Sequence, residues 1–152
     1  MEDVSWQHKS ASIMAVVGSD SKLTIYDIRS KSKSPASVTE RAHKFGGVMA
    51  VDFNPFNPNI LATAGKDGTA GLWDMRMIHC RFHGLDCYEP DLDGENSEEE
   101  NKDYKERAEK EMEVNSISWS NASESILATA GTDRRVRIWD LSRVGAEQSR
   151  ID

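Results

Sequence analysis

Three similar segments run along this chain, and this repetition constrains the fold more than any other feature. Each segment has a short apolar run, a second apolar run that leads into a turn with aspartate, and a third run that ends in an aromatic residue followed by aspartate. These aromatic–aspartate pairs are Tyr26-Asp27, Trp73-Asp74 and Trp139-Asp140. A repeat of this kind indicates a structure built from equivalent units that stack on their neighbours.

The residues within each segment favour β-strands. Apolar and β-branched residues alternate with polar ones, turn residues such as Asn54-Pro55 separate the runs, and no helical period extends through a segment. Trp73 follows Tyr26 by 47 residues, whereas Trp139 follows Trp73 by 66. Because a four-stranded unit takes about 40–45 residues, the longer interval predicts an insertion of roughly 20 to 25 residues. We expect a fourth strand over residues 77–82 before this insertion.

The insertion carries most of the negative charge. The chain has 26 acidic and 19 basic residues, for a net charge of −7. Residues 86–113 contain 13 of the acidic and 4 of the basic residues, which gives this stretch −9 and the remainder +2. Such a chain repels the phosphate backbone, so we expect no direct nucleic-acid binding and favour a basic protein partner. Residues 86–112 form either a solvated loop or part of that contact, and residues 102–112 have the charge spacing of a short helix.

Composition also bears on the compartment. No apolar stretch approaches the ~20 residues of a membrane-spanning helix, so we expect no membrane partner. The chain starts with Met1-Glu2-Asp3, which lacks the basic residues of a secretory signal. Two cysteines are too few for a disulfide framework in a chain of this size. We expect a soluble protein of the nucleus or the cytosol.

The three segments resemble WD repeats, the units of β-propeller proteins. In that family a Trp on the third strand, a Ser or Thr on the second, an Asp in the turn between them and a His before the first strand form a buried hydrogen-bonded tetrad. The second segment has all four, as His43, Thr63, Asp67 and Trp73. The third has Thr129, Asp133 and Trp139, with Glu109 or Lys110 near the histidine position. The first keeps only Asp20, with Val16 and Tyr26 at the other places.

The resemblance implies an all-β fold, a partial propeller of about three four-stranded blades out of seven. The WD repeats are expected at residues 1–29, 43–82 and 113–145, with the acidic insertion at 83–112. Known propellers have ~4–8 blades, so three alone would leave unpaired strand edges. We therefore expect either that the chain is part of a longer protein or that it completes a ring with another chain.

Two residue sets invite a chemical interpretation. His43, Thr63 and Asp67 have the residue types of a catalytic triad, but a tight turn and Trp73 would enclose them, so we expect a structural role, no catalytic residue and no enzyme. The set His79, Cys80, His83 and Cys87 matches no strong zinc spacing. Cys80 alternates with Arg81 in the expected strand and is interpreted as an inward residue. We expect no metal and no cofactor.

A narrower resemblance concerns residues 2–82 and 113–149. Glu2-Asp3-Val4-Ser5-Trp6 and Gly131-Thr132-Asp133-Arg134-Arg135 are similar to the retinoblastoma-binding, chromatin-assembly type of histone-binding WD-repeat proteins, as is the Gly145-Ala146-Glu147-Gln148-Ser149 end. This implies a non-enzymatic scaffold that binds histones within nuclear chromatin assembly, remodelling or histone-modifying complexes.

The same resemblance suggests where a partner would bind. That family takes a basic peptide on an acidic patch of the propeller's top face, where the connection from one blade to the next also lies. Glu2 and Glu113 match the patch, whereas Ser19 and Asn115 depart from it. The alternative left open is a WD-repeat scaffold of ribosome assembly or of another multiprotein complex, because the glutamate-rich WD proteins share the acidic segment.

Overall fold

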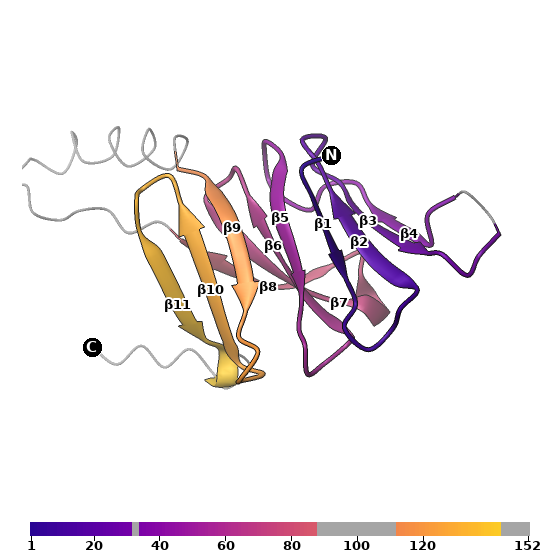
Figure 1. Cartoon of the computed structure of the whole chain (residues 1–152). Helices are drawn as coiled ribbons and strands as arrows, with labels where there is room; N and C mark the ends of the chain where they lie inside the picture. Colours follow the sequence, from indigo (N-terminus) through magenta and orange to yellow (C-terminus); the bar gives the residue numbers. More distant parts are fainter. Residues whose placement is uncertain (32–33, 88–111, 144–152) are drawn as a thin grey trace, which may run out of the picture.

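The computed structural model of the chain describes residues 1–31, 34–87 and 112–143, which form three antiparallel sheets (Figure 1). The first sheet contains β1 (Asp3–Trp6), β2 (Ile13–Val17), β3 (Leu23–Asp27) and β4 (Ser37–Thr39). The second contains β5 (Val48–Phe53), β6 (Ile60–Gly65), β7 (Thr69–Asp74) and β8 (Arg81–Asp86). The described strands of the third are β9 (Val114–Trp119), β10 (Ile126–Gly131) and β11 (Val136–Asp140).

The sheets stand side by side, with strands in chain order within each sheet (Figure 1). Their first strands, β1, β5 and β9, run in the same direction, and β5 packs against both of the others. This is the arrangement of neighbouring propeller blades, in which each first strand lies innermost. The predicted all-β fold of about three propeller blades is confirmed.

The hydrophobic core consists of two layers between the sheets. The first layer packs Leu23 of β3 against Phe53 and Trp73 of the second sheet. The second layer packs Leu72 against Trp119 and Leu127 of the third sheet. The second sheet is therefore buried on both faces, which explains why β6 and β7 are almost continuously apolar or small. The outer sheets have large apolar residues exposed: Val4 and Trp6 in the first, Val136 and Ile138 in the third.

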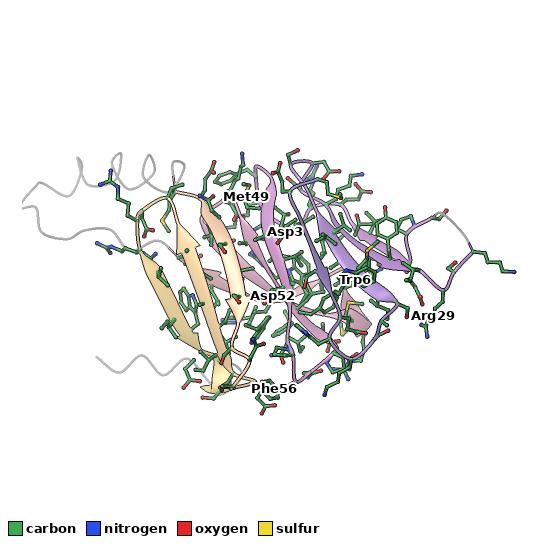
Figure 2. The ribbon with its side chains drawn as sticks, viewed as in Figure 1. Asp3, Trp6, Arg29, Met49, Asp52 and Phe56 are labelled. Carbon is green, nitrogen blue, oxygen red and sulfur yellow. The ribbon has the colours of Figure 1, made fainter. Side chains whose placement is uncertain are left out.

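Two carboxylates connect the innermost strands (Figure 2). Asp3 Oδ2 accepts a hydrogen bond from the backbone N–H of Val51 at 2.9 Å, and Asp52 Oδ2 accepts one from the backbone N–H of Trp119 at 2.8 Å. The Ser5 hydroxyl also donates to Asp52 Oδ1, at 3.3 Å. Burial raises the pKa of Asp52 despite these donors. The side chains satisfy backbone donors at the free edge of the next sheet's first strand, which helps hold the blades together.

The second sheet has the predicted fourth strand, but this strand is β8, Arg81–Asp86, so the predicted bounds of residues 77–82 begin four residues too early. Residues Met75–Met77 form a 3₁₀ turn, η1, because the Asp74 side chain accepts from the backbone N–H of Arg76 at 2.9 Å and also pairs with its guanidinium. The chain therefore enters the strand several residues later. Cys80 lies before the strand and is exposed, which corrects the interpretation of it as an inward residue.

The described helices are single 3₁₀ turns, η1 and η2 (Leu141–Arg143). Within the described ranges no helix has the length and apolar character needed to cross a bilayer. The structure of this part of the chain is determined by its strands and by the turns that join them.

Candidate functional site

Four polar side chains form a buried row in the second sheet. Trp73 Nε1 on β7 donates to Thr63 Oγ1 on β6 at 2.9 Å, and the same hydroxyl lies 2.9 Å from His43 Nε2. His43 Nδ1 lies 2.8 Å from Asp67 Oδ1 in the β6–β7 turn. The structure thus brings together the four residues of the second predicted tetrad.

In one tautomer of His43 every group of the row has a partner. The indole N–H of Trp73 donates to Thr63, the Thr63 hydroxyl donates to His43 Nε2, and His43 Nδ1–H donates to Asp67. Such a continuous chain of bonds rigidifies the interior, because each bond polarises the next in a medium of low dielectric.

Asp67 is the most heavily bonded member of the row. Burial favours its neutral form, but His43 beside it, together with the Thr69 hydroxyl at 2.7 Å and the Lys44 backbone N–H at 2.8 Å, holds the pKa of this carboxyl well below its usual range. The carboxylate therefore fixes the β6–β7 turn and the segment that leads into β5. Arg81 of β8 extends the network by donating to Thr69 Oγ1 at 3.1 Å.

Small residues make room for this row. A Cβ at Gly65 would lie 2.2 Å from His43 Nδ1, and one at Gly71 would lie 3.0 Å from both Thr63 Oγ1 and Trp73 Nε1. Gly68 closes the turn with φ of +73°, a conformation that residues with a Cβ adopt rarely. The histidine ring therefore packs directly on backbone, which excludes water from the row.

The row has the order of a hydroxyl–His–Asp triad but not its accessibility. The side chains of His43 and Asp67 are completely enclosed, and Thr63 has no exposed surface. The Thr63 hydroxyl also already accepts the Trp73 N–H. A substrate carbonyl would have to enter between packed sheets to reach this oxygen, so the geometry suits a structural network and not nucleophilic attack.

The third sheet has a different version of the row. Trp139 Nε1 donates to Thr129 Oγ1 at 2.9 Å, as in the second sheet, but Asp133 pairs with Arg137, whose Nη1 lies 2.6 Å from Asp133 Oδ2. Arg137 pairs with Thr129 across β10 and β11, just as Gly71 pairs with Thr63 across β6 and β7. Arg137 therefore stands at the register position of Gly71 and pairs with the turn aspartate, as His43 does in the second sheet.

Arg137 was absent from the predicted tetrad, although the aligned repeats contained a signal for it. A long basic residue stands at a register position where the second segment has glycine, opposite a threonine and four residues after an aspartate. Glu109 and Lys110, predicted near the histidine position of the third segment, lie outside the described residues. Cys87 Sγ approaches Thr129 Oγ1 at 3.8 Å from the other side, and burial raises the pKa of this thiol.

The first sheet has no such row. Val16 and Tyr26 replace the hydroxyl and the tryptophan, and Asp20 lies in an exposed β2–β3 turn. There Asp20 Oδ1 accepts a weak hydrogen bond from the Lys22 backbone N–H at 3.3 Å. The aspartate therefore shapes its own turn without connecting it to a neighbouring strand.

Glu2 and Glu113 lie at one end of the sheets, before β1 and β9, and β5 stands between those two strands. Glu2 is exposed. The side chain of Glu113 is about one-third exposed and lies 3.9 Å from Lys66 Nζ. The structure therefore places the two carboxylates on the same end without bringing them together. We call this end of the three sheets the Glu2–Glu113 end.

Backbone hydrogen bonds join the turns at the Glu2–Glu113 end to neighbouring segments. Val48 N donates to Gly18 O at 2.9 Å, Lys66 N to Gly47 O at 3.0 Å, and Thr132 N to Glu113 O at 2.9 Å. Ser19 and Asn115, which depart from the family's patch, are exposed at this end and carry no charge. Basic side chains also lie at this end, and Lys22 pairs with Glu40 at 2.8 Å.

Most of the acidic insertion, residues 88–111, lies outside the described residues, including the expected helix over residues 102–112 except for Met112. The described residues on either side of this segment, Cys87 and Met112, are held firmly in the fold. Cys87 N donates to Gly68 O at 3.1 Å, and both Cys87 and Met112 are buried. The insertion therefore starts and finishes at the Glu2–Glu113 end, beside the turn that Asp67 holds.

The four residues considered for zinc are not gathered into a site. Cys80 is exposed and Cys87 is buried against Thr129. Within residues 1–31, 34–87 and 112–143, no three side chains of the His, Cys, Asp and Glu types are grouped as a metal ion would require. We find no donor set in this part of the chain to which a metal can be assigned.

Comparison with known families identifies the repeat. Residues 36–74 and 105–140 match the WD40 family, described as "WD domain, G-beta repeat". The chain contains WD40 repeats. The first match runs from β4 through β7, so one WD repeat contributes the last strand of one sheet and the first three strands of the next. This overlap means that the first matched repeat joins two neighbouring sheets covalently.

One curated relative resembles the WD-repeat chain along almost its whole length. It is the histone acetyltransferase type B subunit 2 of Candida glabrata, with 26% identity over 149 residues, which cover 98% of this chain. The matched region makes up 29% of the relative, so the chain spans less than a third of that protein's length. The narrower resemblance seen in the sequence is therefore found again in an independent comparison.

Proposed function

We propose that this WD-repeat chain is part of a non-enzymatic scaffold that binds histones within nuclear complexes for chromatin assembly, remodelling or histone modification. The observation that carries the proposal is the 26% identity, over 98% of the chain, to a subunit of a histone acetyltransferase. A match that extends through all three sheets includes the turns where propellers bind their partners as well as the strands. Partners of this scaffold are basic proteins, and no nucleic acid or membrane takes part directly.

The structure supports this proposal by separating structural from accessible groups. The His43 row is fully enclosed and stabilises the second blade, whereas Glu2 and Glu113 reach the surface at the Glu2–Glu113 end. The insertion adds 11 acidic and 4 basic residues between positions 88 and 111, and it is anchored at the same end. A lysine-rich histone tail is complementary to this charge.

The test compares binding of core-histone tail peptides to the whole protein and to Glu2→Gln/Glu113→Gln. Asp27→Asn serves as a control, because it removes one carboxylate from the opposite end, where Asp27 pairs with Arg29. Exposed ion pairs contribute about 0.2–1 kcal/mol each, so we expect roughly 2- to 30-fold weaker binding for the double variant at low salt and less at high salt. Equal affinities for the double variant and the control would refute the site.

The insertion is tested separately. A deletion should remove residues 88–111 and not 86–112, because Asp86 belongs to β8 and Met112 is in the core. A second variant should keep the length of the segment but convert its 11 acidic residues to the corresponding amides. If charge is what matters, both variants weaken histone binding and lower its salt dependence. Unchanged affinity and salt slope, or preferential capture of ribosomal proteins, would count against the proposal.

A further inference from the structure

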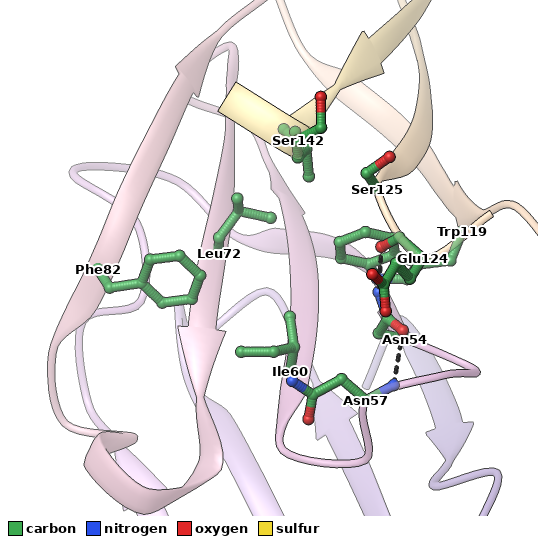
Figure 3. A pocket seen from close by; sticks show the side chains of 10 residues that line it. Asn54, Asn57, Ile60, Leu72, Phe82, Trp119, Glu124, Ser125 and Ser142 are labelled. Atoms are coloured by element: carbon green, nitrogen blue, oxygen red, sulfur yellow. Dashed lines mark hydrogen bonds between the residues drawn. The ribbon is translucent and has the colours of Figure 1, made fainter. Parts of the chain in front are cut away.

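A second candidate binding site lies at the end of the sheets opposite to Glu2 and Glu113. A cavity of about 330 Å³ opens there between the second and third sheets (Figure 3). It is bordered by the β5–β6 turn, the β9–β10 turn and η2. A volume of this size is at the lower end of the range for ligand pockets and is suited to one or two side chains.

The floor of this cavity, which we call the Trp119 pocket, is apolar. Ile60 and Leu72 of the second sheet face Trp119 and Leu141 of the third. Phe82 of β8 forms one wall of the pocket, and 51% of its surface is exposed. An exposed aromatic ring beside an apolar hollow is a typical anchor for a partner's side chain.

Trp119 supplies an observation that packing alone does not explain. The residue is only 6% exposed, and its indole Nε1 is buried without a hydrogen-bond partner among the described residues. The other indoles of the second and third sheets, those of Trp73 and Trp139, donate to threonine hydroxyls. A buried donor without an acceptor is costly, so the Trp119 indole is a sensitive reporter of changes at the floor of the pocket.

The walls of the pocket are held in place before any ligand arrives. The buried Asn54 donates to the backbone oxygen of Glu124 at 2.8 Å and accepts from the backbone N–H groups of Phe56 and Asn57, both at 2.9 Å. One side chain therefore fixes both turns that border the opening. A preformed pocket of this kind avoids the entropic cost of ordering loops on binding.

The charge at the rim of the pocket indicates which charged group of a ligand would lie next to its apolar side chain. Glu124 is the one charged residue among those that line the pocket, and its position in the β9–β10 turn is exposed. The remaining polar lining residues are neutral: Asn54, Asn57, Ser125 and Ser142. A ligand with a positive charge next to its apolar group is therefore favoured over an anionic one.

We propose that the Trp119 pocket binds a short peptide segment of a partner protein, with a leucine- or phenylalanine-type side chain on the apolar floor and a lysine or arginine beside Glu124. The pocket and the Glu2–Glu113 end face opposite ways, so one scaffold holds two partners at once. This inference does not depend on histone binding.

The proposal is tested with the whole protein and blocked heptapeptides of sequence Gly-Ser-Lys-X-Arg-Ser-Gly, in which X is leucine, phenylalanine or glycine. The chain has four tryptophans, so the indole N–H signals in a ¹⁵N NMR spectrum are few, and Trp119→Phe assigns the relevant one. We expect the leucine and phenylalanine peptides to bind at least tenfold more tightly than the glycine peptide and to shift the Trp119 indole signal. Equal binding of the three peptides, or an unmoved Trp119 signal, overturns the proposal.

Two substitutions test the ligand's two parts. Phe82→Ala should weaken the leucine peptide by about 5- to 20-fold, whereas Phe45→Ala, which removes a ring of similar exposure (46%) at the opposite end, should leave it unchanged. Glu124→Gln should weaken it by about 2- to 5-fold at low salt and less at high salt. Equal effects of the two phenylalanine variants, or no effect of Glu124→Gln at low salt, would overturn the assignment. Retained histone-peptide binding by Phe82→Ala distinguishes loss of this site from failure of the proposed function.

Discussion

Replacing Thr63 by valine tests whether the buried row in the second sheet stabilises the fold. Valine keeps the branched shape and removes only the hydroxyl, so the apolar packing of this fully buried position is nearly unchanged. Two groups lose their partner at once: the N–H of Trp73 and the Nε2 of His43, each 2.9 Å from the Thr63 oxygen. The perturbation is thus confined to hydrogen bonding.

The expected cost follows from these two groups. Leaving a buried donor or acceptor without a partner costs about 1–3 kcal/mol, so Thr63→Val should lower the free energy of unfolding by about 2–5 kcal/mol. Thr129→Val in the third sheet is the matched comparison. There the hydroxyl accepts from Trp139, which is partly exposed, and has only a weak thiol contact at 3.8 Å. Because only one group loses its partner and Trp139 is less buried than Trp73, we expect a loss of about 1 kcal/mol.

Both losses are measured by urea unfolding followed by circular dichroism, with the slope of the transition checked for constancy. Thr63→Ser, which retains the hydroxyl, is the second control and should lose markedly less than Thr63→Val. A double-mutant cycle with Trp73→Phe should show a coupling energy of about 1–2 kcal/mol. Equal costs for Thr63→Val and Thr129→Val, or a cost below about 1 kcal/mol for the former, would refute the argument that the row is a satisfied, desolvated network.

Three further predictions concern the same networks. Gly65→Ala should destabilise the protein by about 1–3 kcal/mol or more in urea unfolding, because its Cβ would lie 2.2 Å from His43 Nδ1; a loss below 0.5 kcal/mol would contradict the close packing. Asp133→Asn should cost about 1–2 kcal/mol and more than Arg137→Met, because it leaves a guanidinium side chain that is only 15% exposed without its carboxylate; the reverse order would show that the pair contributes little. The depressed pKa of Asp67 makes its contribution to stability fully present above the ordinary carboxyl pKa near 3.8 and progressively lost as the pH falls below it. The stability lost between pH 5 and pH 3 should therefore be smaller in Asp67→Asn, and identical pH slopes would contradict this.

The period of the sequence was sufficient to predict the sheets but not where every strand begins. The aromatic–aspartate pairs at Trp73-Asp74 and Trp139-Asp140 end β7 and β11, because each aspartate turns the chain through its own side chain. The apolar–polar alternation continues beyond Asp74 and alone predicts a strand there. The hydrogen bond between the Asp74 side chain and the Arg76 backbone makes a 3₁₀ turn locally more stable than an extended chain.

The His43 row and the Trp119 pocket differ in how much of each can be predicted from sequence alone. The residues of the His43 row recur at fixed offsets within a repeat, so alignment could select them before any coordinates were considered. Arg137 and the Trp119 pocket depend on what faces a residue across neighbouring strands and sheets, which no periodicity encodes. The unpaired indole of Trp119 is visible only after its surroundings are known, because the same residue type is satisfied at Trp73 and Trp139.

The buried row and the acidic insertion are physically connected, and this affects how binding experiments are interpreted. Asp67 fixes the β6–β7 turn, and the Gly68 carbonyl of that turn accepts from Cys87, the last described residue before the insertion. On the other side, a Cβ at Gly68 would lie 3.2 Å from the backbone oxygen of Met112, where the described chain resumes. Loosening the row would therefore release both anchors of the insertion. A tetrad variant that weakens histone binding does not identify a contact residue, whereas Glu2→Gln/Glu113→Gln, which leaves this network unchanged, does.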